Sequence, residues 1–449
     1  MKLNGFGFLN RKMAAWYNGI TSSIAFYPVL ITLLYLLLVT GMLWFDYSSL
    51  AKELSEEMPW LKFKEMEAVR AILTTLIAGI ISLMALSFSM VMVVLNQATS
   101  AVSPKVMQGL ITRKEHQFVL GNQFGAILYF MVVLLLLRGV EFYKIPIFSV
   151  SLGLLLAFWS LGLFVYFIHS ISKSIQVTNI ILRIYKSTSA VLDELRDEGP
   201  QFVAATKATF NTPYKYITDK PGYLQEINVK GLLKLAGKHN LVLALEPRFT
   251  DFIPTGSTLF RASVPPETLP EKDLKLLYSN ILFFNSEDIE TNYVYGFTQL
   301  SEIAVKSLSP GINDPGIAVI CLQVLTDLFV KLYPIKVQEV FADEAGTARI
   351  KVKHISGERL LSQVLSPIRH YGKEDLSVVR ALLILLWHLG CADQEERRLR
   401  ELLNQQATGA LTSIRSSLQL PADAQFLNDI IANMQEMEPP YFRISKLEV

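Results

Sequence analysis

The chain has 449 residues, of which 51% are hydrophobic and 18% charged, and its formal net charge is +2. Soluble domains average about 25% charged residues, and the shortage falls in residues 1–169, which contain 12 Lys and Arg and 8 Asp and Glu. The small net charge excludes a general basic surface, so composition does not suggest nucleic acid as a partner. The two cysteines, Cys321 and Cys391, suggest neither a disulfide framework nor paired metal ligands, which fits a reducing compartment.

Four apolar stretches in the first part of the chain approach or exceed the roughly 20 residues that cross a bilayer as a helix. None contains Asp, Glu, Lys or Arg, which is what a costly bilayer interior demands of a span. The first is too long for the apolar region of a cleavable signal peptide and is expected to stay attached. The four predicted spans are residues 24–45, 71–95, 119–137 and 145–169.

The distribution of Lys and Arg around these spans predicts their orientation. Nine basic residues flank the side that carries the N-terminus, and six flank the other side. An even number of spans then places both termini in the cytoplasm. We therefore expect a transmembrane domain (1–169), a helical stalk (170–199), a small β-rich module (200–266) and a mainly helical cytosolic domain (267–449).

The second predicted span has small and polar residues on one helix face, at intervals of three, four or seven. Such a face allows a neighbouring helix to approach closely, and it is also suited to lining a water-filled path. The sequence leaves both interpretations open. The polar members of the face, with one adjacent amide, are Ser82, Ser89, Asn96, Gln97, Ser100 and Ser103.

The third span begins with a GxxxG motif, Gly121 to Gly125, which encloses the two amides Asn122 and Gln123. Glycines at this spacing permit close helix crossing, and the amides are able to bond between helices or subunits. The motif is short and frequent, so helix packing and a role in conduction both remain open.

Beyond residue 169 the pattern predicts a mixed but mostly helical fold. Helical periodicity continues through residue 195, as if the fourth span were prolonged into the stalk. Strands are predicted at 223–227 and 241–245, followed by two short strands within 251–259 and a hairpin of 336–341 with 348–354. Helices are predicted at 229–239, 271–284, 288–308, 314–333, 357–371, 373–389, 393–418 and 423–434.

A Pro- and Gly-containing segment lies between two of these helices. In it, Gly311 is suited to a left-handed conformation, Asp314 to an N-cap and Pro315 to the first helical turn. Free N–H groups at the start of the second helix are able to bind an anion. A rigid elbow, a small anionic ligand or ion site and a subunit contact are all open interpretations. The candidate residues are Lys306, Ser309, Gly311, Asn313, Asp314 and Gly316.

No phosphate loop, HExxH, GxSxG or CxxC motif occurs, and the six histidines have no ligand-like spacing. We therefore expect no enzyme, cofactor or metal. The polar spans favour an ion channel or pore-like transport protein, a homo-oligomer in the lipid bilayer regulated by its cytosolic domain. The alternative is a membrane-anchored signalling or scaffolding protein without transport activity.

Several of these segments resemble a bacterial family of predicted membrane proteins called domain of unknown function 2254. The resemblance is carried by Phe88-Ser89 to Lys105, by Tyr295-Gly296-Phe297, and most specifically by Leu308-Ser309-Pro310-Gly311-Ile312-Asn313-Asp314-Pro315. It implies a bacterial inner-membrane protein with a cytoplasmic C-terminal region and brings no established activity. Lys105 stands where members often have Arg, and Gly316-Ile317 where they have an aromatic residue and Thr, which weakens a ligand role for that helix start.

Overall fold

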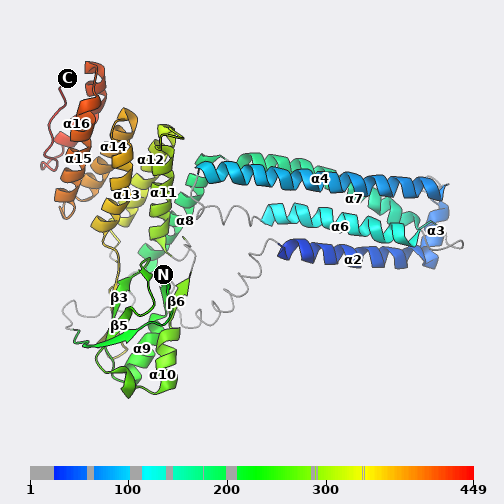
Figure 1. Ribbon diagram of the computed structural model, residues 1–449, viewed down its shortest axis with the longest axis horizontal. Coiled ribbons are helices and arrows are strands. Elements are labelled where there is room, and N and C mark those ends of the chain that lie inside the picture. Colours follow the sequence, from blue (N-terminus) through cyan, green and yellow to red (C-terminus); the bar gives the residue numbers. More distant parts are fainter. Residues whose placement is uncertain are drawn as a thin grey trace. The chain divides into compact units, whose positions relative to one another are not determined.

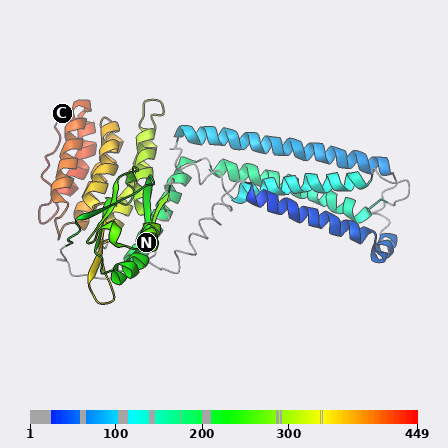
Figure 2. The same cartoon turned by 60° about the horizontal axis from the view of Figure 1, so that its bottom comes forward.

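The computed structural model describes residues 25–57, 65–101, 114–137, 145–174, 176–198, 210–284, 289, 292–335, 337 and 339–448. Within them the chain forms two compact units, each drawn in Figures 1 and 2. The membrane unit comprises residues 12–100 and 106–176, and the C-terminal unit consists mainly of residues 177–449.

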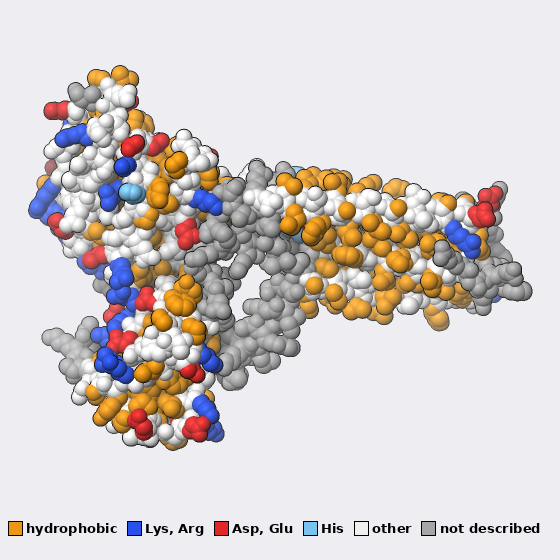
Figure 3. All heavy atoms as spheres, viewed as in Figure 1, with side chains coloured by type: hydrophobic (Ala, Val, Ile, Leu, Met, Phe, Trp, Pro, Cys, Tyr) orange, Lys and Arg blue, Asp and Glu red, His pale blue; other side chains and the backbone are white. Residues whose placement is uncertain are grey.

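The membrane unit is a bundle of long apolar helices. Helix α6 is the most buried of them, and α2 and α7 both pack against it. Helix α4 is the least enclosed. Only 11% of the residues in its apolar segment are buried, compared with 50% in α6. Hydrophobic side chains cover the visible face of this bundle in Figure 3. The helices are α2 (Phe26–Asp46), α3 (Ser49–Glu57), α4 (Met66–Ala101), α6 (Lys114–Leu136) and α7 (Ile147–Ser174).

Two polar contacts stabilise one end of this bundle, and neither was predicted from the sequence. The carboxylate of Asp46, at the end of α2, accepts hydrogen bonds from the backbone N–H groups of Phe148 and Ser149, each at 2.9 Å. It thereby caps the first turn of α7, where a negative charge is favourable. Arg70 on α4 donates to the carbonyl of Leu137. Both contacts hold helices together at the end of the bundle where α2 and α6 finish.

In the C-terminal unit, β-strands from distant parts of the chain form two sheets. The five-stranded sheet has the order β1-β5-β3-β8-β7, with β3 and β8 parallel, and the three-stranded sheet has the order β4-β2-β6. A hydrophobic core joins the sheets to helices α9 (Val229–Lys238) and α10 (Glu271–Ser279). The strands are β1 (Tyr214–Ile217), β2 (Gly222–Ile227), β3 (Leu243–Arg248), β4 (Phe252–Ile253), β5 (Thr258–Ala262), β6 (Ile281–Phe284), β7 (Val340–Ala342) and β8 (Ala348–Lys353).

The remaining helices of this unit pack in successive layers (Figure 1). Helix α8 packs against α11 and α12, α12 packs against α14, and α14 packs against α15 and α16. Short 3-10 turns occur at Pro266–Thr268 and Arg415–Ser417. The helices are α8 (Val177–Glu198), α11 (Tyr293–Ser307), α12 (Pro315–Leu332), α13 (Gly357–Tyr371), α14 (Leu376–Ala392), α15 (Arg400–Ile414) and α16 (Pro421–Gln435).

Three expectations from the sequence need correction. The helix predicted to run unbroken through residue 195 is divided, because α7 ends at Ser174 and α8 begins at Val177. Helix α8 buries its apolar face, which includes Ile180, Ile181 and Ile184, within the C-terminal unit. The predicted helix 271–284 ends at Ser279, because its β-branched and aromatic end pairs with β2 as β6. The predicted helix 393–418 begins only at Arg400.

The expected count of four membrane spans is not confirmed by helix length and hydropathy. Five described helices are long and apolar enough to cross a membrane: four in the membrane unit and α12 in the C-terminal unit. By composition, α12 is one of the more apolar helices of the chain, and sequence reasoning placed it in the cytosolic domain.

Candidate functional sites

The polar face of α4, defined here by Ser82, Ser89 and Asn96, is exposed on the outside of the membrane unit. The residues of α4 that pack inward, among them Leu73 and Ile80, lie on the opposite side of the helix at 3.6 residues per turn. Ser82 donates to the carbonyl of Ala78 at 2.9 Å, so its hydroxyl is satisfied within the helix. Nothing is described of the side chains of Gln97 and Ser100, and Ser103 lies outside the described residues.

The GxxxG segment of α6 lies inside the bundle, against α2. A Cβ atom on Gly121 would fall 2.9 Å from the Cα of Pro28, and one on Gly125 would fall 2.6 Å from the ring of Tyr35. The two glycines therefore let α2 and α6 approach within a distance that larger side chains would prevent.

The two amides between these glycines have different surroundings. Asn122 accepts a hydrogen bond from the Tyr35 hydroxyl at 2.9 Å and donates one to the carbonyl of Phe118 at 2.8 Å. Trp159 on α7 also approaches it, at 3.4 Å. Gln123 is fully buried, and neither of its amide atoms has a hydrogen-bond partner among the described residues. A buried amide without a partner is costly, above all inside a bilayer.

The segment between α11 and α12 is a tight, hydrogen-bonded elbow on the surface. The N–H of Asp314 donates to the carbonyl of Ser307 at 2.8 Å, and the N–H of Asn313 donates to the carbonyl of Ser309 at 2.9 Å. The left-handed conformation predicted for Gly311 occurs instead at Asn313, with φ of 48°. Asn tolerates this region better than most residues because its short side chain bonds locally.

Asp314 precedes the first residue of α12, as expected, but its side chain makes no capping hydrogen bond. A Cβ atom on Gly316 would have one neighbour within 4 Å, the Asp314 carboxylate oxygen at 3.2 Å. The hydroxyl of Ser309 donates to the carbonyl of Lys306 at 2.7 Å, and Lys306 lies in the last turn of α11. These six candidate residues are therefore close together along one exposed turn.

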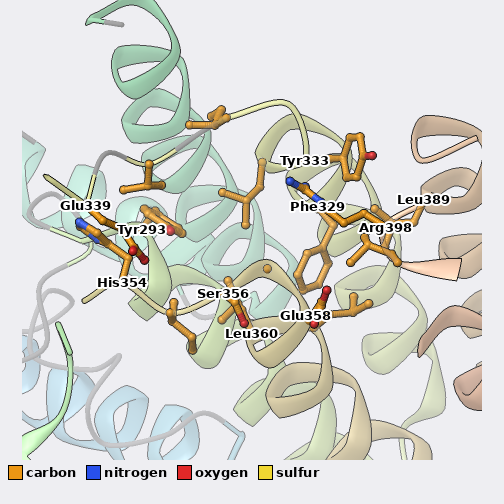
Figure 4. Close-up of a pocket in the computed structure, with 17 residues that line it drawn as sticks. Tyr293, Phe329, Tyr333, Glu339, His354, Ser356, Glu358, Leu360, Leu389 and Arg398 are labelled. Atoms are coloured by element: carbon orange, nitrogen blue, oxygen red, sulfur yellow. The ribbon is translucent and has the colours of Figure 1, made fainter. Parts of the chain in front are cut away.

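The C-terminal unit contains a cavity of about 360 Å³ where the layered helices meet β8 and the loop before β7. Figure 4 shows Tyr293, Glu339 and His354 at one end, and Tyr333, Leu389 and Arg398 at the other. Apolar side chains form much of the wall, including those of Phe329, Leu332 and Leu360. The size and mixed lining are those of a small-molecule site.

The Arg398 end of the cavity is part of a hydrogen-bonded network around Asp393. Asp393 is fully buried and accepts hydrogen bonds from the Tyr333 hydroxyl at 2.6 Å and from the Leu399 N–H at 2.7 Å. Tyr441, near the end of the chain, donates its hydroxyl to the same carboxylate. Burial, together with the hydrogen bond to Asp393, raises the pKa of Tyr333 and keeps the phenol protonated at neutral pH. This end is therefore a structural junction.

At the opposite end of the cavity lies the hydroxyl of Tyr293. Tyr293 is only 8% exposed, yet its hydroxyl makes no hydrogen bond to a described residue. Burial raises the pKa of Tyr293 to about 12, so it remains a neutral donor. Sequence reasoning missed this cavity because its lining comes from α11, α12, α13, α14 and the segments around β7 and β8. Among the described residues, no group of His, Cys, Asp and Glu is arranged to hold a metal ion.

Several helices long and apolar enough to cross a membrane, four of them in one unit, are consistent with a multi-pass membrane protein. Comparison with known families agrees with this class. The chain belongs to the family described as "Predicted membrane protein (DUF2254)", whose profile matches residues 21–387.

Similar proteins occur in mycobacteria. "Uncharacterized protein Rv1290c" of Mycobacterium tuberculosis and "Uncharacterized protein Mb1321c" of Mycobacterium bovis are each 26% identical to this chain over 269 residues. The matched region covers 56% of this chain and 50% of each relative, so the chain spans about half the length of the curated relatives it matches. No solved structure is significantly similar.

Proposed function

We propose that this protein is a homo-oligomeric channel or pore-like transport protein of the bacterial inner membrane, regulated by a cytosolic C-terminal unit. The observation that supports conduction is the outward position of the α4 polar face. In a single subunit Ser82 and Ser89 would face lipid, although polar side chains in membrane helices usually face protein or water. Subunits assembled through α4 would place these hydroxyls along a common axis.

In this proposal four helices cross the membrane, namely α2, α4, α6 and α7. Helix α12 is apolar because it is a core helix of the C-terminal unit, where it packs against α8, α11 and α14. Asp327 and Lys331 on α12 contact Tyr185 and Ser189 of α8, and these polar contacts fit a water-soluble unit. With four spans and the observed distribution of Lys and Arg, both termini lie in the cytoplasm.

The test is ion flux through the purified protein in liposomes, measured separately for K⁺ and Cl⁻. We expect protein-dependent flux of one of these ions, reduced at least severalfold by Ser82→Leu or Ser89→Leu. Phe158→Leu is the matched control, because Phe158 is an exposed side chain of α7, 73% accessible. Each variant is first checked by size-exclusion chromatography, so that loss of flux is not loss of assembly.

The scaffolding alternative gives a different result. A properly assembled protein without flux of either ion, or with flux that both serine variants leave unchanged, would contradict a conduction path along α4. The polar face would then be a subunit or partner contact only, and a cryo-EM map showing apolar side chains along the oligomer axis would agree with that outcome.

A further inference from the structure

We propose that the cavity of the C-terminal unit binds a small organic cation: a primary amine attached to an aromatic or aliphatic body. This binding is independent of ion conduction by the membrane unit, because every residue that lines the cavity belongs to the C-terminal unit. The apolar wall would receive the body of the ligand, and the Tyr293 end would receive the ammonium group.

The wall of the cavity is suited to an apolar or aromatic body. The rings of Tyr293, Phe329 and Tyr333 line it, together with Leu332 and Leu360. Its volume of about 360 Å³ matches small-molecule sites. Aromatic faces also attract ammonium groups through their quadrupole, so the same rings favour a cation over a neutral ligand of equal size.

The charged groups around the cavity favour a positive ligand. The carboxylates of Glu339 and Glu358 line it, and neither forms an ion pair with a described residue. The one arginine of the lining is already engaged: its guanidinium lies 5.2 Å from the centre of the Tyr333 ring and 3.8 Å from the Glu396 carboxylate. An anion would therefore meet two free carboxylates and a cation that has partners.

The start of α13 also borders the cavity, and its own residues provide a side-chain cap and a negative charge. Ser356 caps the helix by accepting a hydrogen bond from the N–H of Arg359 at 3.2 Å, and Glu358 provides the negative charge that the first turn favours. The carboxylate of Glu358 at this helix start repels an anionic ligand.

Tyr293 offers the cavity a hydroxyl that makes no hydrogen bond to a described residue. Tyr293 is more than nine-tenths buried and lines the cavity, and Figure 4 shows it beside Glu339 and His354. A phenol hydroxyl both donates and accepts hydrogen bonds, so one without a protein partner is available to a polar group of a ligand. An ammonium group bound to the Glu339 carboxylate would lie at the same end of the cavity as the Tyr293 hydroxyl, whose oxygen is able to accept a hydrogen bond from it.

The test is isothermal titration of the full-length protein in nanodiscs with phenethylammonium. The control ligands are the anion 3-phenylpropionate, which has the same two-carbon linker to the ring, and the neutral isostere 2-phenylethanol. We expect saturable binding of phenethylammonium only, weakened about tenfold by Glu339→Gln or Glu358→Gln and weakened to a lesser degree by Tyr293→Phe. Glu344→Gln is the matched control, because Glu344 is exposed in the turn between β7 and β8 and does not line the cavity.

Two results would overturn the inference. One is the absence of saturable phenethylammonium binding up to about 10 mM, beyond the millimolar range of weak ligands. The other is binding that Glu339→Gln and Glu358→Gln leave equal to that of Glu344→Gln, or that 3-phenylpropionate reproduces. Since these carboxylates are exposed, the variants are expected to fold, and unchanged circular dichroism verifies this. A channel without amine binding, or amine binding without a channel, would separate this inference from the proposed function.

Discussion

Gly296 of α11 lies directly against Thr188 of α8, so that a Cβ atom on Gly296 would fall 1.8 Å from the Thr188 hydroxyl oxygen. Thr188 is fully buried, and its hydroxyl donates to the carbonyl of Ile184 at 2.7 Å, so it has little freedom to move away. The Tyr295-Gly296-Phe297 segment, part of the family resemblance, therefore owes its glycine to a helix crossing. This crossing joins the first helix of the C-terminal unit to the layered helices.

We expect Gly296→Ala to lower the free energy of unfolding of the C-terminal unit by about 1–3 kcal/mol, because overpacking forces the two helices apart. Denaturant titration followed by circular dichroism measures the change. Gly311→Ala is the control, since no atom lies within 4 Å of its ideal Cβ position, and it should change stability by less than about 0.5 kcal/mol.

A second substitution tests the proposed cause. Thr188→Ala removes the hydroxyl that the new methyl group would strike, so the Gly296→Ala, Thr188→Ala double variant should recover part of the loss. If the two changes were simply additive, the helix crossing would not be the reason for the glycine.

Asp393 connects the C-terminal segment around Tyr441 to Tyr333, which follows α12. Its carboxylate accepts hydrogen bonds from two tyrosines and from the N–H groups of Arg398 and Leu399. Asp393→Asn replaces one acceptor oxygen by a donor that faces other donors, so we expect a loss of about 2 kcal/mol or more. Tyr441→Phe removes a single hydrogen bond and should cost about 1 kcal/mol.

Denaturant titration and limited proteolysis of the C-terminal segment measure both effects. Asp429→Asn serves as the control, because Asp429 is exposed and accepts only from Gln425 on the same helix. Equal effects of Asp393→Asn and Asp429→Asn would mean that the junction contributes nothing to stability.

Glu246 joins three strands of the five-stranded sheet. Its carboxylate on β3 lies 2.6 Å from Lys353 of β8 and 2.5 Å from Arg261 of β5. The hydrogen bond from Lys353, opposed by desolvation and reinforced by the bond from Arg261, lowers the pKa of Glu246 below its ordinary value. A carboxyl whose pKa is lower in the folded state stabilises the protein above its unfolded pKa of about 4.3 and loses that contribution as pH falls through the folded pKa.

Glu246→Gln should therefore shift the acid unfolding midpoint of the protein to higher pH, while changing stability at pH 7 by less than about 1 kcal/mol, since the group is partly exposed. Acid titration followed by circular dichroism provides the measurement. Glu267→Gln is a control without an ion pair to a described residue. An unchanged acid midpoint for Glu246→Gln would contradict a stabilising role for these contacts.

Sequence patterns predicted most helices of the C-terminal unit within a few residues, because apolar periodicity and Gly, Pro or Asp boundaries act locally. They did not predict that β7 and β8 would join β3 and β5, since strand pairing between residues 243 and 350 has no local signature. The strand β6 was missed for the same reason: its four apolar residues extend a helical pattern, and only its pairing with β2 fixes it as a strand.

In the candidate sites, too, local features were predicted from the sequence and features that depend on long-range packing were not. The spacing of Ser82, Ser89 and Asn96 predicts one face of α4, but only packing shows that these three residues are exposed. Turn chemistry predicted that α12 begins at Pro315 after Asp314, but it placed the left-handed residue at Gly311, whereas the positive φ occurs at Asn313. The cavity around Tyr293 was not readable, since its lining residues are far apart in sequence.

Helices α6 and α7 are antiparallel, and three contacts define their register. Phe130 approaches Gly153, Asn122 approaches Trp159, and the ring of His116 lies 5.4 Å from that of Phe167. In this register Gln123 of α6 lies at the level of Ser160 of α7. Both side chains are fully buried, and neither Gln123 nor the Ser160 hydroxyl has a hydrogen-bond partner among the described residues.

An amide buried without a partner destabilises the folded bundle, so we expect Gln123→Met, which keeps the volume, to raise the free energy of unfolding by about 1–2 kcal/mol. The neighbouring substitution Asn122→Leu should have the opposite sign, because it leaves the Tyr35 hydroxyl without its acceptor. Retention of the size-exclusion peak after heating in detergent measures both. If Gln123→Met instead lowered stability, the amide would be satisfied by water held between α6 and α7, since buried waters bridge such groups and are costly to remove.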